Sequence, residues 1–91
     1  MSVSLRVPKD LRRYCGGHAA VELAGGSVGE LLRDLAGQFA ELAHRVLDED
    51  GQLRSHLVVI RNDQVLPRDG LASASVAEGD DLRIYVAVSG G

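Results

Sequence analysis

The residues of this chain with the clearest chemical potential are its last two, Gly90 and Gly91. Glycine has no Cβ and accepts nearly any backbone conformation, so a terminal pair of glycines forms a thin thread. The α-carboxylate of Gly91 is ionised at neutral pH, because such groups have a pKa of about 3.3 to 3.7. It is an acceptor and an oxygen nucleophile that can enter a narrow site on another protein. A frayed end without a function is the alternative at this point.

The other residues that could carry chemistry are explained by structural roles or lack the partners that a reaction needs. Cys15 has no neighbouring base except His18, and a loop cysteine without an activating partner is inert. The three histidines are scattered and form no i, i+4 pair, so no metal site is predicted. Asp80 and Asp81 are adjacent and point to opposite sides on entering a strand, which favours turn and strand-start roles. We therefore predict no catalytic residue, no metal ligand and, without a phosphate-binding loop, no bound ATP.

Composition excludes several classes of partner. The 91 residues carry a net charge of −3, and the densest basic cluster is only Arg12-Arg13 beside Lys9 and Arg6, which argues against nucleic acid. No apolar stretch approaches the length of about 18 residues that a membrane span needs. One cysteine cannot form an internal disulfide. We therefore expect a cytoplasmic protein with no membrane partner.

The N-terminal half has two strand patterns and one helix pattern. Val3, Leu5 and Val7 alternate with polar residues, which predicts a strand over residues 2–7 that Pro8 stops. A second alternation around Val21 and Leu23 predicts an antiparallel hairpin partner.

The helix signal begins at Ser27, which forms a capping box with Glu30. Apolar residues then recur at spacings of three and four, which predicts a helix from Val28 to about His44 that Gly29 and Gly37 weaken.

The C-terminal half reads as three further strands. Residues 56–61 are strongly β-forming, Asn62-Asp63 is a turn, and residues 64–66 form a short return strand. Residues 48–51 form a polar loop, and Glu78-Gly79-Asp80 forms another turn. An alternating pattern over residues 82–89 predicts the last strand.

This order of elements predicts an α+β chain of the β-grasp, or ubiquitin-like, arrangement. A mixed sheet of about five strands should have its first and last strands parallel at the centre, with one main helix on one face. The inward strand residues that need this common partner are Val3, Leu5, Val21, Leu23, Leu57, Val59, Leu82 and Ile84. Residues 1–91 are then one domain, and residues 88–91 a flexible C-terminal tail.

The whole chain resembles the ThiS/MoaD family of ubiquitin-like sulfur carriers. The resemblance rests on the element order, the turns at 62–63 and 78–80, and the ending Val88-Ser89-Gly90-Gly91. Leu11-Arg12-Arg13 followed by Gly16-Gly17 is most similar to the CysO-like branch. Ser89 departs from that branch, where a small apolar residue is common, but it preserves the size.

The resemblance implies a carrier and not an enzyme. In such proteins an E1-like enzyme uses ATP and Mg²⁺ to adenylate the terminal carboxylate, here that of Gly91, and sulfur then replaces AMP to leave a thiocarboxylate. A sulfur-accepting biosynthetic enzyme is the second implied partner. Four extended residues reach about 13 Å at ~3.3 Å each, enough to carry Gly91 into a neighbouring active site.

The partner also needs a docking surface on the body of the domain. If Leu57 and Val59 face the helix, Val58 and Ile60 face outward, and the last strand adds Tyr85 and Ala87 beside them. Together with Val88 and Ser89 of the tail, these residues are the predicted partner-docking set. Outward β-branched residues that merely favour strands are the alternative.

Two other functions remain open from the sequence. One is a non-covalent ubiquitin-like interaction module, and the other is the small subunit of molybdopterin synthase. The acceptor of the sulfur is equally open, between a cysteine precursor, molybdopterin, a thiazole and a secondary metabolite. So is whether Gly91 is the mature terminus or is exposed by processing.

Overall fold

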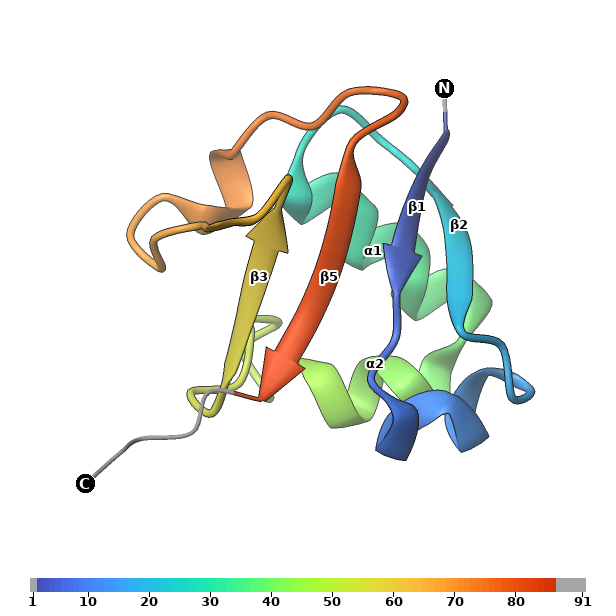
Figure 1. Cartoon of the computed structure of the whole chain (residues 1–91). Coiled ribbons are helices and arrows are strands. Elements are labelled where there is room, and N and C mark those ends of the chain that lie inside the picture. Colours follow the sequence, from blue (N-terminus) through green and yellow to red (C-terminus); the bar gives the residue numbers. More distant parts are fainter. Residues whose placement is uncertain (1, 87–91) are drawn as a thin grey trace.

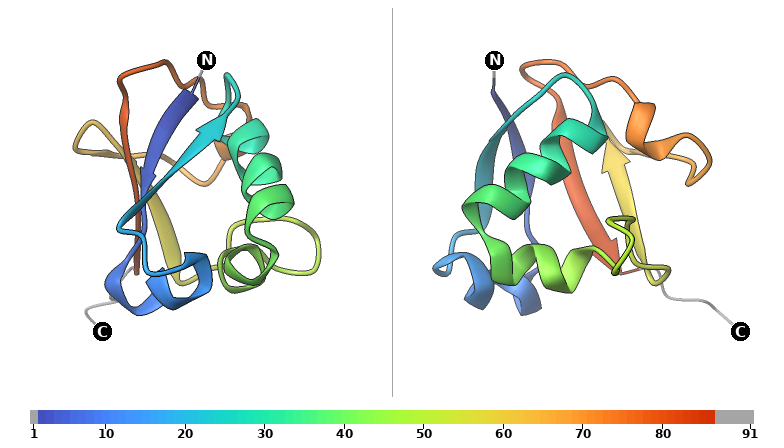
Figure 2. Two further views of the ribbon diagram at one scale, coloured as in Figure 1. Left: turned by 90° about the vertical axis from the view of Figure 1, so that its right-hand side faces the viewer. Right: turned by 180° about the vertical axis from the view of Figure 1, so that it is seen from behind.

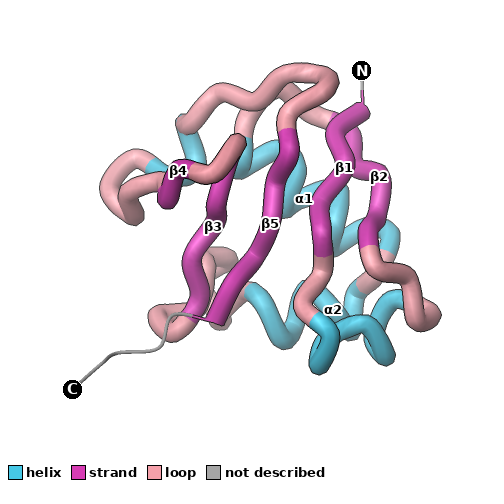
Figure 3. The backbone as a smooth tube through the Cα atoms, viewed as in Figure 1, coloured by secondary structure: helices cyan, strands magenta, loops and turns pink. Residues whose placement is uncertain are grey.

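The computed structural model describes residues 2–86 as a five-stranded sheet with helices packed on one face (Figures 1 and 2). Met1 and residues 87–91 lie outside the described part. The strands are β1 (Ser2–Arg6), β2 (Ala20–Ala24), β3 (Leu57–Arg61), β4 (Gln64–Val65) and β5 (Asp81–Val86). Their order in the sheet is β2-β1-β5-β3-β4, which Figure 3 shows from the open face.

The first and last strands lie side by side at the centre, as the sequence predicts. β1 and β5 are parallel, with Leu5 opposite Leu82, while the pairs β1–β2, β3–β4 and β3–β5 are antiparallel. Asn62 and Asp63 both have positive φ, 51° and 71°, as a two-residue hairpin turn requires. This turn sets the register of β3 and β4. The predicted mixed sheet and the β-grasp order are therefore confirmed.

The predicted single helix is wrong in one respect, because it is divided in two. α1 spans Val28–Gln38 and α2 spans Ala40–Val46, and Phe39 between them has φ −135° and ψ 75°. A straight helix over residues 28–46 would be roughly 28 Å long at about 1.5 Å per residue, whereas a five-residue strand spans roughly 17 Å. The bend at Phe39 keeps Leu42 and Val46, which are 1% and 0% exposed, over the core.

The capping box at the start of α1 is confirmed with one shift. The Ser27 hydroxyl accepts a hydrogen bond from the Glu30 backbone N–H at 3.2 Å. The Glu30 carboxylate reaches one residue beyond the cap and accepts from the Gly26 N–H at 2.7 Å. Two otherwise unpaired donors at the helix start are thereby satisfied.

Two 3₁₀ helices occupy stretches for which the sequence predicts a loop, at residues 9–18, or no regular element, at residues 71–77. η1 spans Lys9–Cys15 and packs against α2, and η2 spans Leu71–Ser73 and packs against α1. The core between the sheet and these helices is aliphatic. It contains all of the inward strand residues that the alternation predicts, namely Val3, Leu5, Val21, Leu23, Leu57, Val59, Leu82 and Ile84. Within residues 2–86 no helix is long and apolar enough to cross a membrane.

The two glycines of α1 should respond oppositely to alanine. At Gly29 an added Cβ would lie 2.9 Å from the Ala72 carbonyl oxygen in η2, whereas at Gly37 nothing lies within 4 Å. Gly37→Ala should raise the free energy of unfolding by about 0.5 to 1 kcal/mol through helix propensity. Gly29→Ala should lower it by about 1 kcal/mol or more, because η2 must move away from α1. Urea unfolding of both variants measures the contrast, and equal gains would contradict the close approach of α1 and η2.

Candidate functional site

The face of the sheet opposite the helices has an apolar surface over β3, β4 and β5. Val58 lies directly opposite Tyr85 on β5, and Ile60 lies between Arg83 on β5 and Val65 on β4. Residues opposite one another in an antiparallel pair share a face, so these side chains are neighbours. We call Val58, Ile60, Val65 and Tyr85 the open-face patch.

The register of β3 is the predicted one. Leu57 and Val59 are 1% and 3% exposed in the core, whereas Val58 and Ile60 are half-buried on the other side. Tyr85 is 47% exposed. The alternation along the strand therefore correctly separated the two faces.

Val65 is a member of the patch that the sequence analysis missed. It is 60% exposed, the most exposed of the large hydrophobic residues in the described part of the chain. The signal was present, because a two-residue turn at Asn62-Asp63 places Val65 opposite Ile60.

The end of β5 differs from the simple alternation. Val86 follows Leu82 and Ile84 on the inward side, yet it is 51% exposed because the core on this strand ends at Ile84. Val86 lies opposite Leu57 at the start of β3. The remaining predicted site residues, Ala87, Val88, Ser89, Gly90 and Gly91, lie outside the described residues.

A charged network flanks the open-face patch. Asp81 accepts from Arg6 at 3.2 Å and from Arg83 at 3.1 Å, and Arg83 also lies 3.5 Å from Asp63. Hydrogen bonding to Tyr85 first, and to Asp81 second, raises the pKa of Arg83 above its usual value. Arg83 lies beside Ile60, and its Nε has no hydrogen-bond partner among the described residues.

The turn before β5 is tied to the β3–β4 turn. Asp80 accepts hydrogen bonds from the Ala77 N–H at 2.8 Å and from the Asn62 amide at 3.1 Å, and these bonds lower the pKa of Asp80. The Asn62 side-chain oxygen in turn accepts from the Asp81 N–H. Asp80 and Asp81 thus serve as turn and strand-start residues, as predicted, and Asp81 pairs with Arg83.

Cys15 is not the loop residue that the sequence suggested. It ends η1, is 1% exposed and belongs to the core. Its thiol lies 3.5 Å from the Arg12 carbonyl and 3.4 Å from that of His18, both hydrogen-bond acceptors. The packing of η1 buries the thiol, so it is not accessible as a nucleophile. Residues 2–86 contain no group of three or more side chains suited to hold a metal.

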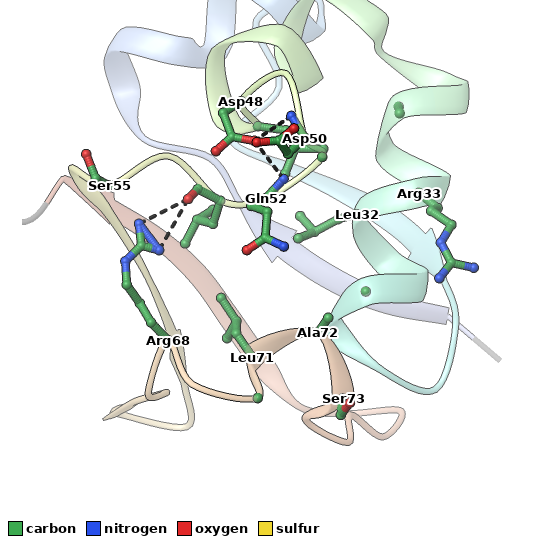
Figure 4. Close-up of a pocket in the computed structure, with 16 residues that line it drawn as sticks. Leu32, Arg33, Asp48, Asp50, Gln52, Ser55, Arg68, Leu71, Ala72 and Ser73 are labelled. Atoms are coloured by element: carbon green, nitrogen blue, oxygen red, sulfur yellow. Dashed lines mark hydrogen bonds between the residues drawn. The ribbon is translucent and has the colours of Figure 1, made fainter.

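A groove of about 800 Å³ lies on the helical side of the molecule (Figure 4). α1, η2 and the 47–55 loop form its walls, with Leu32 and Leu71 pointing into it. Arg68 on its rim donates to the Leu53 carbonyl, and Asp48 accepts from the Asp50 and Gln52 N–H groups. These polar groups hold the loop in place, and the groove is separate from the open-face patch.

Comparison with known proteins agrees with this architecture. The ThiS family model matches residues 5–91. The chain is 29% identical to the sulfur carrier protein CysO of Mycobacterium tuberculosis across the full length of both proteins, and 36% identical to small archaeal modifier protein 1 of Haloferax volcanii over 90% of this chain and 92% of that one.

The fold is also similar to a solved structure. The BexX/CysO complex of Amycolatopsis orientalis contains a chain that superposes with a TM-score of 0.82 at 33% identity, covering 97% of this chain and 98% of that one. With the sheet order, the hairpin turn and the family match over residues 5–91, the chain belongs to the ThiS family of ubiquitin-like sulfur carriers.

Proposed function

We propose that this chain is a sulfur carrier whose Gly91 carboxylate is adenylated by an E1-like enzyme and converted to a thiocarboxylate for a biosynthetic pathway. The observation that carries the proposal is the family match, which extends through Gly90 and Gly91, and the similarity to the sulfur carrier CysO supports it. In this proposal the chain is a protein co-substrate and not an enzyme. ATP and Mg²⁺ are bound by the activating partner.

The chemistry explains why a partner is needed. A carboxylate is a poor acyl donor, so its oxygen first attacks the α-phosphorus of ATP and releases pyrophosphate. A persulfide sulfur then attacks the carbonyl carbon and AMP leaves. A further thiol cleaves the resulting S–S bond, which leaves sulfur on Gly91. These steps need ATP and reduced thiols, so we place the protein in the cytoplasm.

The open-face patch is the proposed docking surface for the activating enzyme. Val58, Ile60 and Tyr85 form a contiguous apolar group to which the structure adds Val65. Apolar side chains gathered in this way on an exposed sheet favour a protein contact. Ala87, Val88 and Ser89, which follow β5, would extend the contact toward the activated terminus.

Intact mass tests the proposed function. The purified chain is incubated with ATP, Mg²⁺, an E1-like enzyme of the same organism and a persulfide donor. We expect the mass to rise by the difference between one sulfur and one oxygen, with the change confined to the C-terminal peptide. If the same enzyme adenylates a second carrier protein in a parallel reaction but this chain gains no mass, the proposal is contradicted and a non-covalent module is favoured.

A second candidate uses the same activated terminus. The similarity to small archaeal modifier protein 1 favours transfer of Gly91 to an amine of another protein. The same incubation with cell extract would then yield covalent adducts of higher mass. Co-purification with a large synthase subunit would instead favour the small subunit of molybdopterin synthase.

Cys15 should not take part in sulfur loading. In Cys15→Ser the single O–H can donate to the Arg12 or to the His18 carbonyl, but it places a more polar group in the core. We expect a loss of about 1 kcal/mol or more in the free energy of unfolding and an unchanged yield of thiocarboxylate per folded molecule. Loss of loading in folded Cys15→Ser would move the chemistry away from Gly91.

A further inference from the structure

A basic surface forms where η1 packs against α2, in a chain whose net charge is −3. The two elements carry four cationic side chains and two carboxylates, Lys9, Arg12, Arg13 and Arg45 against Asp10 and Glu41. Lys9, Arg13 and Arg45 are exposed. We call these three residues the η1–α2 basic surface.

Two arginines of this surface lie over the ring of Tyr14. The Arg45 guanidinium carbon lies 4.7 Å from the centre of the Tyr14 ring, and that of Arg13 lies 5.8 Å from it. Tyr14 itself packs against the core. A guanidinium that stacks on a ring uses its flat face and leaves its N–H edge free to bind a carboxylate in a bidentate manner.

The charges of this surface are not used within the described part of the chain. The ion pairs among residues 2–86 all involve Arg6 or Arg83, with Asp63 or Asp81 on the other side of the pair. Arg12 is different from its neighbours, because its Nε donates to the Val7 carbonyl and ties η1 to the end of β1. Arg13 and Arg45 lie over an aromatic ring and form no ion pair with a carboxylate among residues 2–86.

The position of the surface connects it to the terminus. Figures 1 and 2 show η1 and α2 at the same end of the molecule as the C-terminal end of β5. The described part of the chain therefore ends, at Val86, on the side of the domain that carries the basic surface.

We propose that the η1–α2 basic surface docks a carboxylate-rich face of the activating enzyme, beside the opening that admits the terminal glycines. This inference rests on the proposed function. Complementary charges steer encounter and raise association rates by about 10- to 1000-fold, and salt screens the effect. A protein partner is favoured over nucleic acid, because three exposed cations on a chain of charge −3 make few phosphate contacts.

Single charge reversals test the proposal with a matched control. Arg13→Glu and Arg45→Glu are compared with Arg33→Glu, an exposed arginine of α1 on the rim of the helical-side groove. All three change the net charge equally. We expect the first two to slow association with the activating enzyme by about tenfold at low salt. Arg33→Glu should change the rate by about twofold or less, and about 0.5 M NaCl should remove the difference.

Each other outcome overturns the inference. An equal slowing by Arg33→Glu would mean that only net charge matters, and unchanged rates for Arg13→Glu and Arg45→Glu would remove the contact. Binding of single-stranded RNA that Arg13→Glu abolishes would assign the surface to nucleic acid. If Arg45→Glu loses stability because the Arg45–Tyr14 contact is lost, the comparison rests on Arg13→Glu, which keeps the Arg45–Tyr14 contact.

The inference and the proposed function can fail separately. Wild-type protein that gains no sulfur in the intact-mass experiment contradicts the carrier function. Wild-type protein that is loaded, together with an Arg13→Glu variant that binds the enzyme as fast as wild type at low salt, contradicts the docking surface alone.

Discussion

Deletion of Gly91 should abolish adenylation and leave the folded domain intact. In the proposed function the activated acyl group is that of Gly91, and without this residue the carboxylate would lie one residue short of the partner's catalytic centre. One extended residue spans about 3.3 Å, so the reacting oxygen would lie about 3 Å from its position for attack on the α-phosphorus. Misplacement by even about 1 Å can cost about 100-fold in rate, so we expect activity to fall below detection.

Pyrophosphate release with the E1-like enzyme measures this effect, and thermal unfolding supplies the control. The core cluster is formed by described residues up to Ile84, so the melting temperature should not change. A truncated chain that is still activated, or that unfolds, would contradict the assignment. Gly90→Ala is a milder test, because its added methyl group should obstruct a narrow channel. Normal activation of that variant would show a wider channel.

A charge on the two faces of β3 should separate binding from folding. Val59 is 3% exposed in the core, so Val59→Asp should cost several kcal/mol of stability, because an unpaired carboxylate is buried. Ile60 lies on the open face opposite Arg83, which can accommodate a new carboxylate. Ile60→Asp should therefore remain folded and weaken binding to the activating enzyme by about 2 kcal/mol or more, if the patch is desolvated in the complex.

Melting temperature and affinity are measured on both variants together. Because Arg83 can neutralise a carboxylate at position 60, Val58→Asp serves as a second variant, opposite the uncharged Tyr85. Loss of affinity in both open-face variants with a near-native melting temperature would support docking. Native affinity in both open-face variants would show that the patch does not bind the enzyme. If Ile60→Asp unfolds and Val59→Asp is tolerated, the two strand faces are reversed.

The sequence by itself determined the sheet and the likeness to a family. Alternation separates Val59 from Ile60, because successive side chains of a strand point to opposite faces regardless of what surrounds them. The pairs Ser27/Glu30 and Asn62/Asp63 are equally local, since a cap or a tight turn depends on residues at most three positions apart. These features were predictable because the physics that produces them acts between near neighbours along the chain.

Tertiary packing decided what lies far apart in sequence. A helical pattern cannot show that the chain bends at Phe39. The position of the bend depends on the length of the sheet that the helices cover. Cys15 is buried only because η1, which has no clear period of its own, packs on α2. The patch joining Val65 to Tyr85 and the contact of Arg45 with Tyr14 likewise depend on strand order and helix packing. The alternation and the Asn62-Asp63 turn indicate parts of the patch, but the bend at Phe39, the burial of Cys15 and the Arg45–Tyr14 contact form only when the core brings distant segments together.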